Sequence, residues 1–286
     1  MSINVGYELG FNGDYAFIDG KRFSDYGFMW KDLHNLTGID YETLQMYDDW
    51  YILDGGLYYF KKHCVFEELF MSELASICKV KCVEFKLASV EDKIGVISKL
   101  YRENNKKYYM YTDFCRKYFN HVPDNLRVLK LASLISFGDK IGQQLMDDIF
   151  NLVCFDIFSG QWDREEHNFF FECDKNIVSL APLCDNGMIF SGNFIYSTPF
   201  AKFSLSSIDE SVVYRNNLFQ ILRFDEAFFN KFAALLDIDI NEVVKKTLEK
   251  YKIFIADCDR DYILEYFDER KKAIDLTLKL SRNYGR

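Results

Sequence analysis

One stretch near the middle of the chain, residues 163–187, constrains this sequence more than any other part. It runs DREEHNFFFECDKNIVSLAPLCDNG. Asp163 stands five residues before Asn168, and Asp185 begins an Asp-x-Gly pattern 22 residues after Asp163. This spacing is typical of a phosphoryl-transfer site, in which the first Asp is the catalytic base and the Asn and the second Asp bind metal.

The residues between these polar groups predict a β-hairpin. Two short β-prone runs, 168–172 and 177–180, are joined by the polar residues 173–176, which suit a tight turn. A short hairpin brings its two ends together. We therefore expect Asn168 and Asp185 to lie close enough to share a Mg²⁺ ion, which prefers oxygen ligands.

The two runs GQWDREEHNFFF and IVSLAPLCDNG resemble the HipA-like kinase family, including its small bacterial serine/threonine kinases. They are more distantly similar to the loop of phosphatidylinositol-3-kinase-type enzymes. The resemblance implies an α+β, bilobal protein-kinase-like fold with a strand-rich N-lobe and a mainly helical C-lobe. It also implies that ATP and Mg²⁺ are used to phosphorylate a serine or threonine hydroxyl of a protein. Asp163 would then be the catalytic base, and Asn168 and Asp185 the metal ligands.

One position departs from the family pattern, because Glu165 stands where a His usually follows the Asp-Arg pair. The departure leaves open a pseudokinase that serves as a nucleotide-binding interaction module. A kinase of a small molecule or a lipid head group is a further alternative, since the sequence does not name the acceptor. The resemblance also raises the expectation of an antitoxin-type partner.

A lysine and a glutamate upstream are candidates for binding the phosphates of ATP. Strand-forming residues flank Asp54-Gly55-Gly56, which predicts a hairpin whose second strand ends at Lys61. Apolar residues at helical spacing follow over 66–79, and Glu73 falls on that apolar stripe. A buried carboxylate needs a cation. We therefore expect a Lys61–Glu73 ion pair of the kind that kinases use, with Lys62 as the alternative lysine.

The distribution of patterns along the chain predicts two lobes. Residues 1–103 are expected to form the N-lobe, with further strands at 81–87 and 94–98, and residues 104–286 the C-lobe. A helical stripe begins at Ile141 and should end at Gly160, just before Asp163. The remaining helical patterns cover 226–236, 240–252 and 261–281.

Composition limits the partners that the chain is expected to have. The net charge of −9 argues against sequence-independent binding of nucleic acid, because contacts to phosphates need a basic surface. Nowhere do 18 apolar residues follow one another without a charge, so no membrane span is expected. Arg164, next to the predicted base in the sequence, is expected to neutralise a nearby acid or to bind a backbone carbonyl.

Eight cysteines are scattered among apolar residues. They are expected to be reduced thiols in a reducing compartment, which points to the cytoplasm. Cys78 and Cys82 follow His63-Cys64, but no second close-spaced cysteine pair exists. Buried thiols are therefore favoured over a zinc site.

Overall fold

The computed structural model describes residues 3, 6–7, 16–17, 50–53, 56–90, 93–102, 106–120, 140–161, 164, 170–190, 222–223 and 225–283. The strands in this part of the chain are β1 (Gly6–Tyr7), β2 (Ala16–Phe17), β3 (Trp50–Leu53), β4 (Gly56–Lys61), β5 (Phe85–Val90), β6 (Lys93–Lys99), β7 (Lys107–Met110), β8 (Phe170–Asp174), β9 (Ile177–Leu180) and β10 (Ile253–Phe254). The helices are α3 (Val65–Ile77), α4 (Tyr111–Phe119), α6 (Gln143–Ser159), α8 (Glu226–Ala233), the 3-10 helix η6 (Ala234–Asp237), α9 (Ile240–Tyr251) and α10 (Asp257–Asn283).

In the described part of the N-terminal region, five strands form a sheet in the order β2-β5-β6-β4-β3. The expected hairpin is present, because β3 and β4 pair antiparallel with Trp50 opposite Tyr59. Its turn residues Asp54 and Gly55 lie outside the described residues. On its other side β4 pairs with β6, which puts Lys61 opposite Val96. The lysine is thereby fixed at the end of a strand that has a partner on both sides.

The second predicted hairpin is also present. Strands β8 and β9 pair antiparallel, and β7 adds a third strand on the other edge of β8. The turn is shorter than the expected span 173–176, because β8 continues through Asp174 and only Lys175 and Asn176 connect the strands. Lys175 has a φ of 55°, a backbone conformation that is common in tight hairpin turns.

Helix α6 ends at Gly160, as the sequence predicts, and Gly160 has a φ of 72°. A side chain at this position would meet the Tyr266 hydroxyl at 2.0 Å, so α6 and α10 approach closely here. The buried Arg270 of α10 donates from Nε to the carbonyl of Phe158 at 2.7 Å. Because carbonyls at a helix end lack partners within the helix, this bond fixes the point where the chain leaves α6 towards Asp163.

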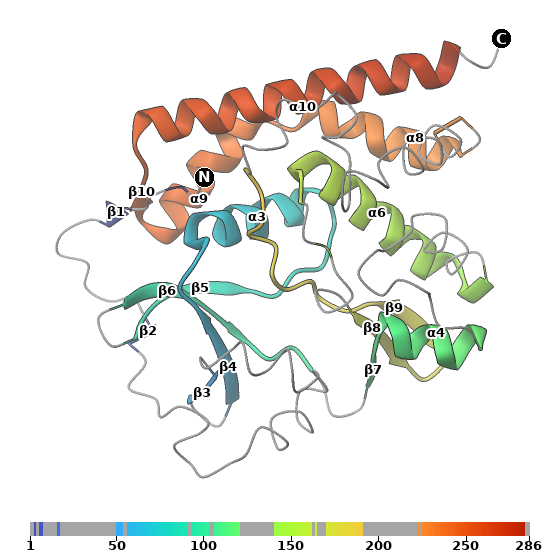
Figure 1. The fold of residues 1–286 in the computed structure, drawn as a ribbon, viewed down its shortest axis with the longest axis horizontal. Coiled ribbons are helices and arrows are strands. Elements are labelled where there is room, and N and C mark those ends of the chain that lie inside the picture. Colours follow the sequence, from blue (N-terminus) through green and yellow to red (C-terminus); the bar gives the residue numbers. More distant parts are fainter. Residues whose placement is uncertain are drawn as a thin grey trace.

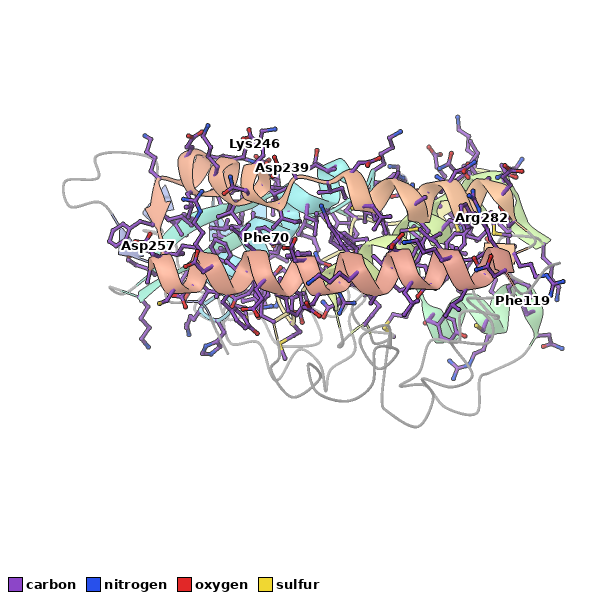
Figure 2. All side chains as sticks on the ribbon, turned by 90° about the horizontal axis from the view of Figure 1, so that it is seen from above. Phe70, Phe119, Asp239, Lys246, Asp257 and Arg282 are labelled. Atoms are coloured by element: carbon purple, nitrogen blue, oxygen red, sulfur yellow. The ribbon has the colours of Figure 1, made fainter. Side chains whose placement is uncertain are left out.

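Helix α3 lies between the five-stranded sheet and a layer formed by α8, α9 and α10 (Figure 1). Phe66 and Phe70 are fully buried. The ring of Phe70 lies 5.6 Å from that of Phe267 on α10. Seen from above, Phe70 lies between α9 and α10 (Figure 2). Burial on both sides makes α3 a central element of the core rather than a helix on the surface of the sheet.

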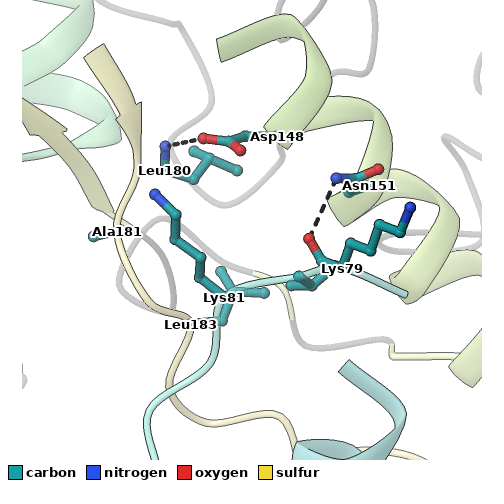
Figure 3. A pocket seen from close by; sticks show the side chains of 8 residues that line it. Lys79, Lys81, Asp148, Asn151, Leu180, Ala181 and Leu183 are labelled. Atoms are coloured by element: carbon teal, nitrogen blue, oxygen red, sulfur yellow. Dashed lines mark hydrogen bonds between the residues drawn. The ribbon is translucent and has the colours of Figure 1, made fainter. Parts of the chain in front are cut away.

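The expected strand over 81–87 begins only at Phe85. The residues before it run beside the segment after β9: Val83 donates from its backbone to Leu183 at 2.9 Å, and Leu183 to Lys81 at 2.8 Å. Asn151 of α6 holds the carbonyl of Lys79 at 3.3 Å, and a small pocket opens beside these contacts (Figure 3). These residues form a connection between the regions instead of a sheet strand, because their hydrogen bonds go to the C-terminal region.

All eight cysteines are free thiols. Burial raises the pKa of Cys64 to about 11 and that of Cys184 to about 12, so both stay protonated at neutral pH. Among the described residues no group of three or more His, Cys, Asp and Glu side chains is placed to hold a metal ion. None of the helices that the structure describes has the length and apolar character needed to cross a bilayer.

Candidate active site

Three residues from separate parts of the chain meet at the end of β4, and we call them the Lys61 cluster: Lys61, Glu68 and Asp185. The Nζ atom of Lys61 lies 2.5 Å from Oε1 of Glu68 in α3. It also donates to Oδ1 of Asp185, in the segment after β9. The Lys61 side chain is 15% exposed, and that of Glu68 is completely buried. The cluster thus joins the sheet, α3 and the Asp-x-Gly segment.

The two carboxylates keep Lys61 charged. Burial would lower the pKa of Lys61, but Glu68 and Asp185 outweigh that effect and raise it. Burial also raises the pKa of Glu68, while the charge of Lys61 opposes the shift. In the cluster two carboxyl groups face a single ammonium. A site of this kind favours an additional cation.

The expected Lys61–Glu73 ion pair is wrong. Glu73 instead lies 2.5 Å from Nζ of Lys250 on α9, with 19% of its side chain exposed. The reason is geometric: only three residues separate Lys61 from the start of α3, and a helix rises about 1.5 Å per residue. Glu68 is therefore about 4.5 Å along the helix from Val65, whereas Glu73 is about 12 Å along it. Lys61 reaches the first turns of the helix and not its last.

Glu68 also holds the backbone of the Asp-x-Gly segment. Its Oε2 accepts from the backbone N–H of Asn186 at 3.0 Å, and its Oε1 accepts from that of Gly187 at 3.0 Å. A Cβ on Gly187 would meet the Cβ of Cys64 at 2.7 Å and Glu68 Oε1 at 3.0 Å. Glycine is thus required for the carboxylate to approach the chain, which in turn fixes the Asp185 backbone (φ 54°).

A second buried ion pair involves Arg164, the residue that follows Asp163 in the sequence. Arg164 donates from Nε to Asp156 Oδ2 at 3.0 Å and from Nη2 to Asp156 Oδ1 at 2.9 Å, and both side chains are fully buried. Its Nη2 also donates to Asn186 Oδ1 at 2.8 Å. The expectation that Arg164 neutralises an acid is confirmed. A two-point pair of this kind orients both partners, so it ties residue 164 to α6 and to the Asp-x-Gly segment.

Asp163 and Asn168 lie outside the described residues, as does Glu165. Their neighbours in sequence are placed: Arg164 is anchored to Asp156, and Phe170 begins β8. Gln161, two residues before Asp163, donates from Nε2 to the backbone carbonyl of Asp185 at 3.2 Å. The chain on both sides of these two predicted site residues is therefore attached to the segment that carries Asp185.

The side chains of Asp185 and Lys61 have the chemistry that binding of a Mg²⁺–nucleotide requires. Asp185 offers carboxylate oxygens, the ligand type that Mg²⁺ prefers, and 26% of its side chain remains exposed. Lys61 supplies a charged ammonium of the kind that contacts ATP phosphates. Neither Glu68 nor Asp156 shares this access, because both are fully buried. Asp185 and Lys61 are thus the groups that a ligand can reach.

Sequence patterns missed Glu68 and Asp156. Periodicity assumes that only one face of a helix is buried, and it puts Glu68 outside the apolar face of α3. In the structure the first two turns of α3 are buried almost all round, so Glu68 is buried as well. Asp156 carried a usable signal, since it interrupts the apolar run 149–158. A carboxylate in such a run needs a cation, and the nearest downstream arginine is Arg164.

A scan of the sequence against protein-family models finds no match, and a search of curated proteins finds none either. Comparison of the structures does find neighbours. The Helicobacter pylori proinflammatory kinase CtkA superposes with a TM-score of 0.50 at 17% sequence identity, covering 83% of this chain and 92% of that chain.

A second neighbour is a chain from the Shewanella oneidensis MR-1 toxin–antitoxin complex of HipA, HipB and operator DNA. It superposes with a TM-score of 0.53 at 10% identity, covering 79% of this chain. The match spans 59% of that neighbour's length. The chain therefore shares the bilobal α+β fold of these two neighbours, and the resemblance inferred from residues 163–187 is confirmed at the level of the fold.

Proposed function

We propose that this chain is an ATP- and Mg²⁺-dependent kinase of the HipA-like type that phosphorylates serine or threonine hydroxyls of a protein. The observation that carries the proposal is the Lys61 cluster, in which a strand-end lysine, a helix glutamate and an Asp-x-Gly aspartate meet. Kinases combine the same three residue types to bind phosphates and metal. The kinase neighbours in fold support the same class of activity.

In this proposal each residue has one role. Glu68 holds Lys61 in place, and Lys61 binds the α- and β-phosphates of ATP. Asp185 and Asn168 hold Mg²⁺, which neutralises charge on the phosphate oxygens when bound. Asp163 orients the acceptor hydroxyl and accepts its proton. Most of the rate acceleration then comes from positioning and charge neutralisation.

The setting of the enzyme belongs to the proposal as well. We place the boundary between the lobes at residues 103 and 104, between the five-stranded sheet and β7, which pairs with β8 of the C-lobe. Eight free thiols support a reducing compartment such as the cytoplasm. The HipA–HipB complex among the neighbours supports a search for an antitoxin-type partner of this chain.

The test is transfer of label from γ-labelled ATP with Mg²⁺, to protein acceptors in a cell extract and to the chain itself. Wild-type protein should label serine or threonine residues. Asp163→Ala and Asp185→Ala should abolish labelling, while Glu73→Ala should leave it near the wild-type level. Equal labelling by wild type and Asp163→Ala would refute the assignment of the base. Label that appears only in lipid or small molecules would move the acceptor to another class.

A pseudokinase is the second candidate, and Glu165 in the usual His position is the observation that favours it. It predicts that the wild-type protein binds ATP but transfers nothing, and that Glu165→His increases transfer. If Glu165→His instead causes a large loss of activity in an active wild type, the carboxylate itself has a specific role.

A further inference from the structure

The first residues of the chain contact α3 beside the Lys61 cluster. Ile3 is 5% exposed and belongs to the main hydrophobic core. Its backbone N–H donates to Oε1 of Glu67 at 2.9 Å, in a buried environment. A few residues later β1 pairs antiparallel with β10, with Gly6 opposite Phe254. We call Ile3 together with β1 (Gly6–Tyr7) the N-terminal strap, because Ile3 contacts α3 and β1 pairs with β10, between α9 and α10 (Figure 1).

Glu67 is an unusual residue for its location. It is 1% exposed, and within the part of the chain that the structure describes its Oε2 has no hydrogen-bond partner. Burial raises the pKa of its carboxyl, and the Ile3 N–H opposes that shift. A buried carboxyl with one oxygen unpaired costs stability, so the hydrogen bond that its other oxygen, Oε1, accepts is informative. This Oε1 accepts the hydrogen bond from the Ile3 backbone N–H, and Ile3 belongs to the N-terminal strap.

Glu67 and Glu68 are consecutive in the first turn of α3, so any rotation or slide of this turn moves both side chains together. Consecutive residues of a helix are about 100° apart around its axis. Glu67 therefore contacts the strap on one side while Glu68 contacts Lys61 and the backbone of Asn186 and Gly187 on another. The far end of α3 is held separately, through Glu73 and Lys250.

We propose that the N-terminal strap, acting through Glu67, is a positioning element of the candidate active site. It fixes the first turn of α3 in the one orientation in which Glu68 reaches Lys61 and both amides of the Asp-x-Gly segment. Releasing the strap loosens these contacts without removing any residue that touches nucleotide. The consequence for catalysis rests on the proposed kinase function, but the structural coupling does not.

The structural test is the rate of amide hydrogen exchange at Asn186 and Gly187. It is monitored by NMR on the full chain labelled with ¹⁵N-asparagine and ¹⁵N-glycine. Ile3→Ser should speed exchange of these two amides by up to about tenfold, the factor expected for one weakened hydrogen bond. Leu278→Ser is the matched control, since Leu278 is similarly buried at 6% exposure but lies in the C-terminal half of α10, far along the chain from the strap. It should leave the exchange of these amides at the wild-type rate.

Two variants of Glu67 separate positioning from simple packing. Glu67→Ala removes the acceptor and should speed the exchange of these two amides as Ile3→Ser does, whereas Glu67→Gln keeps an acceptor oxygen and should leave their exchange at the wild-type rate. In an active enzyme, Ile3→Ser and Glu67→Ala should raise KM for ATP–Mg²⁺ and lower kcat. Glu67→Gln should keep both constants near their wild-type values.

Unchanged exchange in Ile3→Ser, together with a loss of stability equal to that of Leu278→Ser, would overturn the proposal and leave Ile3 as an ordinary core residue. If the wild-type protein transfers no phosphate, the proposed function fails while the exchange measurement still decides the role of the strap.

Discussion

Replacing Glu68 by alanine should be far more damaging than replacing Glu73, although both glutamates belong to α3 and both contact a lysine. Glu68→Ala removes the acceptor of two buried backbone N–H groups, at Asn186 and Gly187. Each buried donor left without a partner costs about 1–3 kcal/mol. The largely buried Lys61 also loses one of its two carboxylate partners. Together these losses predict a destabilisation of about 3–5 kcal/mol, the range for breaking a buried pair.

Glu73→Ala is the matched control. The Lys250 side chain is 51% exposed and that of Glu73 19%, so water screens this pair far more than it screens the Lys61 cluster. Pairs of this kind contribute about 0–1 kcal/mol. The measurement is the free energy of unfolding of both variants by urea titration, with wild type alongside. A loss below about 1 kcal/mol for Glu68→Ala, or equal losses for the two variants, would refute the arrangement of the Lys61 cluster.

Two further predictions concern neighbours of this cluster. Gly187→Ala should lower both the unfolding free energy and the affinity for ATP–Mg²⁺, because the new Cβ would meet the Cys64 Cβ at 2.7 Å and Glu68 Oε1 at 3.0 Å; wild-type behaviour in both assays would contradict it. Glu67→Gln should change how stability varies with pH. Since the folded-state pKa of Glu67 is raised, wild type loses stability relative to the variant as the pH rises from about 4.3, the unfolded-state value, through the folded-state pKa. Unfolding titrations between about pH 4 and pH 8 check this, and parallel profiles for the two proteins would contradict it.

Local patterns were sufficient for much of the fold. Both hairpins formed where β-prone residues flank turn-forming ones, since hairpin pairing is set by residues close in sequence. Gly160 ended α6 because glycine adopts the left-handed conformation without steric cost. The pattern at 261–281 identified α10, although the helix starts earlier, at Asp257.

Contacts between distant segments were harder to predict. Periodicity indicates Glu73 and gives no signal for Glu68, because it assumes one buried face, whereas the first turns of α3 are buried by the sheet on one side and by C-terminal helices on the other. The hydrogen bond from Ile3 to Glu67 joins residues 64 positions apart, so no local pattern predicts it. The roles of Asp163 and Asn168 stay predictions, since both lie outside the described residues.

The measurement that tests the central claim most directly is the effect of Mg²⁺ on ATP affinity, by isothermal titration calorimetry. If the Lys61 cluster is a metal–phosphate site, wild-type protein binds ATP tightly with Mg²⁺ and weakly with a chelator, because Asp185 contacts the nucleotide mainly through the ion. Asp185→Ala should remove this difference, and Glu73→Ala should keep it. Equal ATP affinity of the wild-type protein in Mg²⁺ and in chelator would contradict the account.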